Sequence, residues 1–261
     1  MLLTISLLIL TGVTAGILAG LLGIGGGLVI VPALTFILRA QGTDVGIATP
    51  VAVATSLGTM LLTSASAIWF HDRRGGIEWP AVARLGPAVA LGAIAGALLA
   101  AHLPGLILAR IFAVLAFIIG LRMLLAVRPP QTDRAPWPRA WPVLGPLIGA
   151  VSALMGIGGG SFNVPYLARN GYPMVRAVAI ASACGWPIAL GGLAGFIIAG
   201  WGQRLVEHAI GFIHLPALLI IGLAGAAAAP LGVALAHRLP ATALKRLFGL
   251  LLILVAIRMA W

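Results

Sequence analysis

The chain has 261 residues, of which 61% are hydrophobic and only 8% are charged, and its mean hydropathy is +1.14. A soluble domain carries about 25% charged residues, so this composition excludes an ordinary soluble protein and indicates an integral membrane protein. The net charge of +11 comes from Lys and Arg scattered over short connections, which indicates orientation signals and headgroup contacts and disfavours nucleic-acid binding. Because Cys184 is the only cysteine, an internal disulfide is excluded.

Eight apolar segments follow one another, and most reach the ~20 residues that a membrane-spanning helix needs. They cover residues 2–38, 45–70, 80–101, 104–127, 141–168, 174–200, 208–236 and 239–261. The longest polar connection separates the fourth segment from the fifth. We therefore expect an all-α integral membrane protein with a first membrane repeat over residues 1–127, a connecting loop over 128–140 and a second membrane repeat over 141–261.

A glycine-rich string occurs twice, as GLLGIGGGLVIVP from Gly20 to Pro32 and as ALMGIGGGSFNVP from Ala153 to Pro165. Around these strings, 9 of 17 positions agree at a constant offset of 133 residues. Such self-similarity indicates that the chain consists of two homologous halves with four apolar segments each. The matching pairs are 16–32 with 149–165, 51–58 with 178–185, and 103–123 with 239–259.

The basic residues predict how the two halves are oriented. If all eight segments cross the membrane, the 16 Lys and Arg divide nine to seven between the two sides. If the first and fifth segments dip in and return, each half crosses three times, the halves are inverted repeats, and twelve of the 16 lie on one side. Cytoplasmic loops carry an excess of Lys and Arg, so we favour inverted repeats with glycine-broken or re-entrant first segments. The twelve are Arg73, Arg74, Arg84, Arg122, Arg128, Arg134, Arg139, Arg169, Arg176, Arg238, Lys245 and Arg246.

The GIGGG strings at Gly23–Gly27 and Gly156–Gly160 are expected to break their helices, because glycine readily adopts positive φ and lets a backbone approach a ligand closely. A helix that restarts after such a break presents unpaired N–H groups and a positive dipole end, which suit an anion. The restarted helices are expected over Leu28–Leu38 and Ser161–Ala168, each with a proline in its first turn. The alternative is that the glycines only allow close helix packing.

The candidate substrate-binding residues are the glycines nearest each restart and the polar residues around them. Asn163 could donate its amide to an anion oxygen or could cap freed backbone groups, and the hydroxyl of Ser161 could bond its own helix instead. The hydroxyls of the second and sixth segments could equally bond neighbouring helices. The full set is Gly25, Gly26, Gly27, Gly158, Gly159, Gly160, Ser161, Asn163, Thr55, Ser56 and Ser182.

The acidic and histidine side chains lie in connections or toward segment ends. This placement disfavours a carboxylate proton relay, a metal site and an integral-membrane enzyme, so we expect no catalytic residue, metal or cofactor. The acids are Asp44, Asp72, Glu78, Asp133 and Glu207.

The strings GLLGIGGGLVIVPAL and MGIGGGSFNVPYL, each followed by a loop and a Thr/Ser-bearing helix, give the chain a resemblance to the sulfite exporter TauE/SafE family over essentially its whole length. The resemblance implies a multi-pass protein of the bacterial plasma (inner) membrane that moves sulfite, organosulfonates and related anions, usually outward. Leu28 and Ile30 in the first copy stand where the second has Ser161 and Asn163, so polar contacts to a substrate are expected mainly from the second half.

The expected function is a secondary transporter of small sulfur-containing oxyanions, which holds its substrate at the paired GIGGG breaks near the midplane and alternates access between inverted halves. A passive anion channel and a structural membrane subunit are the alternatives. The expected partners are the small anionic substrate and membrane lipid, without nucleic acid. A homo-oligomer remains an open alternative.

Overall fold

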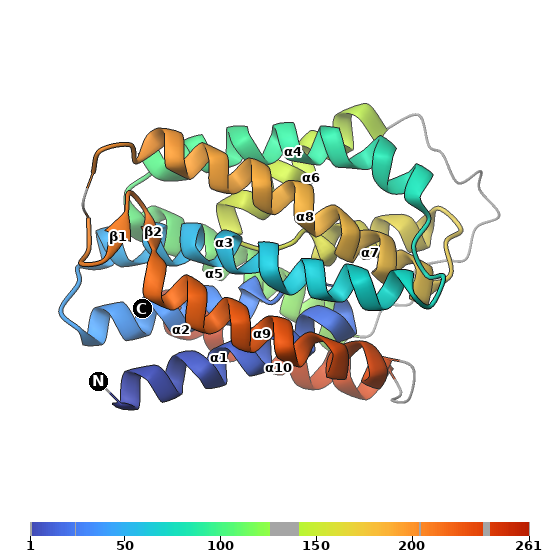
Figure 1. Ribbon diagram of the computed structural model, residues 1–261, viewed down its shortest axis with the longest axis horizontal. Helices are drawn as coiled ribbons and strands as arrows, with labels where there is room; N and C mark the ends of the chain where they lie inside the picture. The colour runs from blue at the N-terminus through green and yellow to red at the C-terminus, as the bar shows by residue number, and fades with distance from the viewer. Residues whose placement is uncertain (1, 24, 126–140, 204, 237–240, 261) are drawn as a thin grey trace.

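The computed structural model describes residues 2–23, 25–125, 141–203, 205–236 and 241–260 as a bundle of helices along one direction (Figure 1). The all-α fold class is confirmed. The connecting loop expected at 128–140 lies outside the described residues. The first half contains α1 (Leu2–Leu22), α2 (Gly27–Ala40), α3 (Val45–Asp72), α4 (Trp79–His102) and α5 (Gly105–Leu124); the second contains α6 (Trp141–Met155), α7 (Gly160–Arg169), α8 (Met174–Ala199), α9 (Leu215–Ala236) and α10 (Ala241–Ala260).

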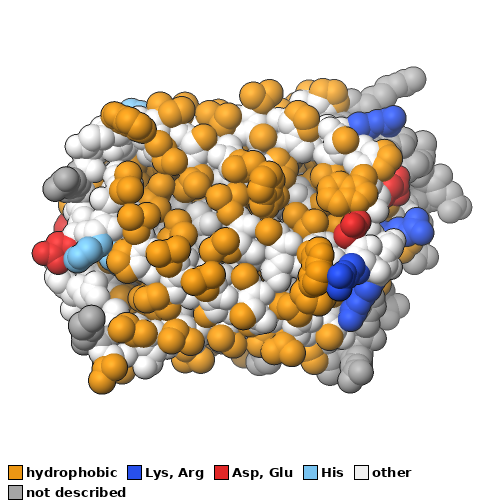
Figure 2. Space-filling view, viewed as in Figure 1, with side chains coloured by type: hydrophobic (Ala, Val, Ile, Leu, Met, Phe, Trp, Pro, Cys, Tyr) orange, Lys and Arg blue, Asp and Glu red, His pale blue; other side chains and the backbone are white. Residues whose placement is uncertain are grey.

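Six of the described helices, α1, α3, α4, α5, α8 and α9, are long and apolar enough to cross a membrane. Hydrophobic side chains cover the middle of the face seen in Figure 2, and the charged and histidine side chains on that face lie toward its two ends. A protein that spans a lipid bilayer needs this arrangement, because the hydrocarbon core offers no partners to charged side chains. The chain is therefore a multi-pass membrane protein.

The first and fifth apolar segments each divide into two helices at their glycines, so the eight expected segments become ten helices in the described parts of the chain. The restarted helices begin at Gly27 and Gly160, one residue before the expected starts. Pro32 and Pro165 lie inside α2 and α7, five residues after those starts. The expectation that they occupy the first turn is therefore wrong, and each proline removes a hydrogen bond from the second turn of its helix.

The seventh apolar segment does not begin as a helix. A two-stranded antiparallel hairpin of β1 (Ala209–Ile210) and β2 (Ile213–His214) precedes α9. The tight turn between the strands contains Gly211 at φ 57°, a conformation that glycine adopts without steric cost. Figure 1 places the hairpin at the end of the bundle where both chain termini lie.

Helices of the first half pack mainly on helices of the second half, and these pairs correspond to each other when the two halves are interchanged. Helix α1 packs on α9, and its equivalent α6 packs on α4; α3 packs on α9, and its equivalent α8 packs on α4. Small residues allow these close contacts: a Cβ on Gly96 would meet the carbonyl oxygen of Ala150, and one on Gly232 would meet that of Ile17. Helices α3 and α8 are the most enclosed spans, with 72% and 67% of their most apolar stretch buried, so they form the centre of the bundle.

Equivalent helices run in opposite directions along the long axis of Figure 1. Helix α3 runs from left to right and α8 from right to left. Helix α1 enters the bundle from the left and α2 returns to the left, whereas α6 enters from the right and α7 returns to the right. Each glycine break therefore lies where the chain reverses inside the bundle.

Candidate functional site

The backbone at both breaks adopts conformations that only glycine takes readily. Gly23, Gly25 and Gly26 have φ of 68°, 77° and 77° in the first break, and Gly156 and Gly159 have 65° and 69° in the second. Gly26 and Gly159 are the N-caps of α2 and α7, and among the described residues neither start has a side-chain cap. The first N–H groups of a helix have no intrahelical acceptor, so both starts offer N–H donors.

The two breaks lie against each other. A Cβ on Gly25 would be 3.0 Å from both Cα and N of Gly158, and a Cβ on Gly27 would fall on the carbonyl oxygen of Gly156. Glycine is required at positions 25 and 27 for this backbone contact, which is a packing role. Helix α3 supports the contact, because Ser56 Oγ donates to the Gly156 carbonyl at 2.8 Å.

A buried polar cluster lies at the start of α7. A Cβ on Gly159 would be 3.1 Å from Asn163 Nδ2 and 3.2 Å from Ser152 Oγ. The side chains of Asn163 and Ser152 are both 0% exposed. Neither amide atom of Asn163, nor Ser152 Oγ, nor Ser161 Oγ has a hydrogen-bond partner among the described residues. A buried polar group without a partner costs about 1–3 kcal/mol, and a polar ligand at this cluster could supply the missing partners.

The first break lacks an equivalent cluster. Leu28 and Ile30, which correspond to Ser161 and Asn163, are 1% and 0% exposed and belong to the hydrophobic core. Ser182 of α8 provides a hydroxyl here, 3.1 Å from where a Cβ on Gly23 would lie, and Ser182 Oγ has no hydrogen-bond partner in the described parts of the chain. The polar groups around the two breaks are therefore distributed asymmetrically.

Thr55 and Ser182 occupy matching positions in the sequence but have different surroundings. Thr55 Oγ1 accepts a hydrogen bond from the backbone N–H of His214 at 3.0 Å, so this hydroxyl anchors the hairpin. Its neighbour Ser56 contacts the second break instead. Four hydroxyl-bearing residues were predicted to bind the substrate. Ser56, Ser161 and Ser182 lie at the breaks, whereas the hydroxyl of Thr55 is hydrogen-bonded to β2.

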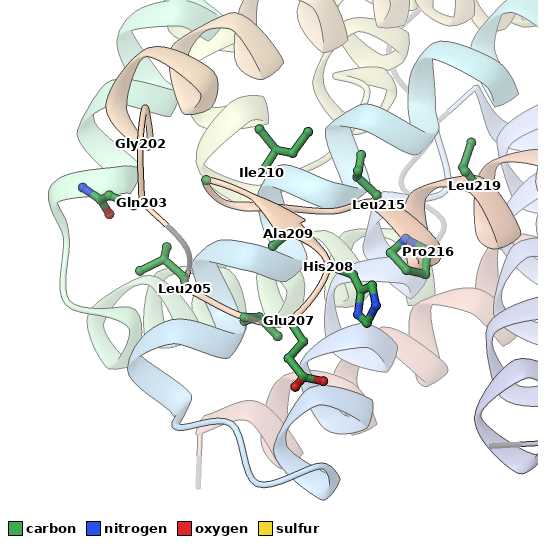
Figure 3. Close-up of a pocket in the computed structure, with 12 residues that line it drawn as sticks. Gly202, Gln203, Leu205, Glu207, His208, Ala209, Ile210, Leu215, Pro216 and Leu219 are labelled. Carbon is green, nitrogen blue, oxygen red and sulfur yellow. The ribbon is translucent and has the colours of Figure 1, made fainter.

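A cavity of about 1110 Å³ lies between the connection after α8 and the first turns of α9 (Figure 3). Its lining includes Gln203, Glu207, His208 and Leu219. The sequence pattern does not predict this cavity. Gly202, with φ of 76°, marks a turn, but a turn residue does not show which apolar surfaces it brings together.

His214 joins the hairpin to α9 as well as to α3. Its Nδ1 accepts a hydrogen bond from the backbone N–H of Ala217 at 3.1 Å. Burial lowers the pKa of His214 from its ordinary value of 6.5, and the neighbouring His208 lowers it further. Because protonation would remove the Nδ1 acceptor, the folded protein favours neutral His214.

The folded state should lose the stabilisation from this cap as the pH falls. The contribution of His214 to the free energy of unfolding is complete above its ordinary pKa of 6.5. It declines as the pH drops through 6.5 toward the lowered pKa of His214 in the folded state. His214→Ala should cost about 1 kcal/mol at neutral pH. His214→Asn keeps a cap acceptor that does not titrate, so thermal unfolding in detergent should show a smaller stability loss on acidification than in the native chain. Equal losses in both proteins would contradict the role of His214.

A second contact joins the halves at the opposite end. Tyr172, between α7 and α8, donates its hydroxyl to Glu78 Oε1 at 3.4 Å, between α3 and α4. Burial, followed by the negative charge of Glu78, raises the pKa of Tyr172 to about 12, although Arg84 opposes the rise. The hydroxyl therefore remains protonated and able to donate. The connections of the two halves are thus linked at this end as well.

The profile of the family described as sulfite exporter TauE/SafE matches residues 8–259. The chain is 37% identical over 257 residues to a "Probable membrane transporter protein" of Haemophilus influenzae, with 98% of this chain and 97% of the relative covered. Similarly named proteins of Methanocaldococcus jannaschii and Xylella fastidiosa are 31% and 29% identical, over 85% and 99% of this chain and 82% and 97% of the relatives. No solved structure matches. The chain therefore belongs to the sulfite exporter TauE/SafE family and is a membrane transporter.

Proposed function

We propose that the chain is a secondary transporter that exports small sulfur-containing oxyanions, such as sulfite or organosulfonates, and binds them at the paired GIGGG breaks near the membrane midplane. Sulfite and the outward direction come from the description of the family, and organosulfonates are added because the sequence resemblance implies them. One observation carries the site: Asn163 is 0% exposed beside the uncapped start of α7, and no described residue bonds its amide. An anion there would accept hydrogen bonds from Asn163 Nδ2 and from the first N–H groups of α7.

The two breaks have different roles in this proposal. The second break binds the anion through Gly159, Gly160, Ser161 and Asn163. The first break supports it, since Gly25 and Gly27 lie against Gly158 and Gly156. Ser56 positions the second break, and the hydroxyl of Ser182 extends the polar surface toward Gly23.

Inverted halves would allow this site to open to each side of the membrane in turn. Two observations support an inverted repeat. Helices α3 and α8 run in opposite directions (Figure 1), and corresponding helices of the two halves make corresponding contacts across the boundary between them. Contacts between the halves occur on both sides of the site, from Thr55 to His214 toward one end and from Glu78 to Tyr172 at the other. Breaking one contact while keeping the other would expose the anion to one side at a time.

Asn163→Ala should weaken binding of sulfite and of methanesulfonate by about 10- to 150-fold, because one hydrogen bond to a charged group contributes about 1.5–3 kcal/mol. Calorimetric titration of the purified protein in detergent measures the change. The melting temperature should stay the same or rise, because the substitution removes a buried amide that has no partner in the described structure.

Asn170→Ala is the matched control. Asn170 follows α7, and its amide donates to the Tyr166 carbonyl at 2.7 Å, so its removal should leave anion affinity unchanged. If Asn163→Ala instead lowers the melting temperature and leaves affinity unchanged, Asn163 has a structural role and the proposed site is wrong.

The inverted arrangement places Arg74 and Arg176 on the cytoplasmic side and Gln203 on the opposite side. Single cysteines at these three positions, in a Cys184→Ala background, test this arrangement with an impermeant thiol reagent on oriented vesicles. Cysteines at positions 74 and 176 should be labelled from the same side, and one at 203 from the other. Labelling at positions 74 and 176 from opposite sides would exclude inverted halves.

A further inference from the structure

The interior around the second break contains no charged side chain in the part of the chain that the structure describes. Every arginine with a described side chain is exposed. His71 is the one buried side chain of acidic or basic type among the described residues. It lies near the end of α3, fifteen residues beyond Ser56, which is about 22 Å along a helix. The groups available to an anion at the start of α7 are therefore neutral.

Neutral donors favour a low ligand charge. The energy gained from fixed dipoles grows in proportion to the charge of the anion, whereas the Born cost of removing that anion from water grows with the square of the charge. A dianion thus gains about twice the attraction of a monoanion and incurs about four times the desolvation cost. The start of α7 supplies the equivalent of about half a positive charge, which compensates half the charge of a monoanion and only a quarter of that of a dianion.

Asn163 also offers an acceptor beside its donor. Its Oδ1 is as buried as its Nδ2, and neither atom has a partner among the residues described. An oxyanion without an O–H, whether a dianion or a sulfonate, can satisfy only the Nδ2 donor, and Oδ1 repels a dianion about twice as strongly as a monoanion. An anion that retains one O–H can satisfy both atoms, because that O–H donates to Oδ1 while another oxygen accepts from Nδ2.

We infer that this site selects singly charged oxyanions, namely hydrogen sulfite and organosulfonates, and excludes sulfite and sulfate dianions. The inference rests on the proposed function and specifies the charge state of its substrate. The absence of a counter-ion from the described surroundings of the site sets the selectivity for a single charge, and Oδ1 of Asn163 adds a preference for hydrogen sulfite, which has an O–H, over organosulfonates.

Calorimetric titrations with sulfite and with methanesulfonate at several pH values test the inference on the full chain. Apparent affinity for total sulfite should fall about tenfold for each pH unit above the pKa of hydrogen sulfite, since only the protonated anion binds. Methanesulfonate remains a monoanion throughout, so its affinity should stay constant, and this arm corrects for any effect of pH on the protein. Sulfate should bind at least 100-fold more weakly than methanesulfonate.

Ser161→Lys supplies the missing cation and should narrow or reverse the preference for methanesulfonate over sulfate. If sulfate, or sulfite at high pH, binds the native chain as tightly as methanesulfonate and still requires Asn163, the charge selectivity is wrong and the proposed site survives. If no anion binds at any pH, or if binding does not depend on Asn163, both the inference and the proposed function fail.

Discussion

Replacing Gly27 by alanine should destabilise the folded protein by about 3 kcal/mol or more, the upper end of what overpacking costs. The added Cβ would overlap the Gly156 carbonyl oxygen and lie 2.9 Å from Ile157 Cα. All these atoms belong to the backbone of the other break, so no side chain can rotate away to relieve the overlap. Thermal unfolding in detergent measures the loss.

Gly192→Ala and Gly92→Ala are the controls for Gly27→Ala. A Cβ on Gly192 would meet Leu57 Cδ1 at 2.7 Å, and that flexible side chain can move. A Cβ on Gly92 would instead fall on the backbone of Pro146, so Gly92→Ala should resemble Gly27→Ala. If Gly27→Ala is no more destabilising than Gly192→Ala, the two breaks are not in contact in the folded protein.

Gly159→Ala should abolish measurable anion binding in protein that still folds. The new methyl group would lie 3.1 Å from Asn163 Nδ2 and 3.2 Å from Ser152 Oγ, where the proposed anion binds. The positive φ of 69° adds about 1–3 kcal/mol of backbone strain, so binding must be measured on the folded fraction after size-exclusion chromatography.

Gly156→Ala separates the loss of binding from the backbone strain. Gly156 has φ of 65° in the same break, but its Cβ would point toward Val31 and Val53 rather than toward Asn163. Both variants should lose stability, and only Gly159→Ala should lose affinity. Equal affinities in the two folded variants would mean that the glycines of the second break serve packing alone.

The helix breaks could be predicted from the sequence because their cause is local. Gly26 and Gly159 begin the restarted helices in the left-handed conformation, which a glycine string permits irrespective of its neighbours. Hydropathy was also sufficient to predict the spanning helices, because each segment that crosses the bilayer must satisfy its own backbone hydrogen bonds and be apolar.

The roles of individual glycines could not be predicted in the same way. A Cβ on Gly25 would meet the backbone of Gly158 in the other string, whereas one on Gly159 would approach the amide of Asn163, four residues further along its own segment. The contact of Gly25 depends on atoms from the other half of the chain, so a sequence repeat cannot supply it. Packing holds for Gly25 and Gly27, and anion binding beside Gly159 stays a prediction.

The hairpin before α9 could not be predicted because long-range contacts stabilise it. Residues 209–213 are apolar or glycine, and the apolar helix α9 begins directly after His214. Phe212 packs edge-on against Phe196 with ring centroids 5.6 Å apart, and the N–H of His214 bonds Thr55. Phe196 lies in the preceding helix α8 and Thr55 lies in α3, so both partners are outside the segment and its periodicity contains no record of them.

The most direct test of the binding site is a structure of the protein with bromomethanesulfonate, in which anomalous scattering locates the bromine. The proposal predicts a bromine peak beside the start of α7, with a sulfonate oxygen at about 2.7–3.2 Å from Asn163 Nδ2. A peak confined to the cavity beside the hairpin, or no peak at α7 under conditions where the protein binds the anion, would contradict it.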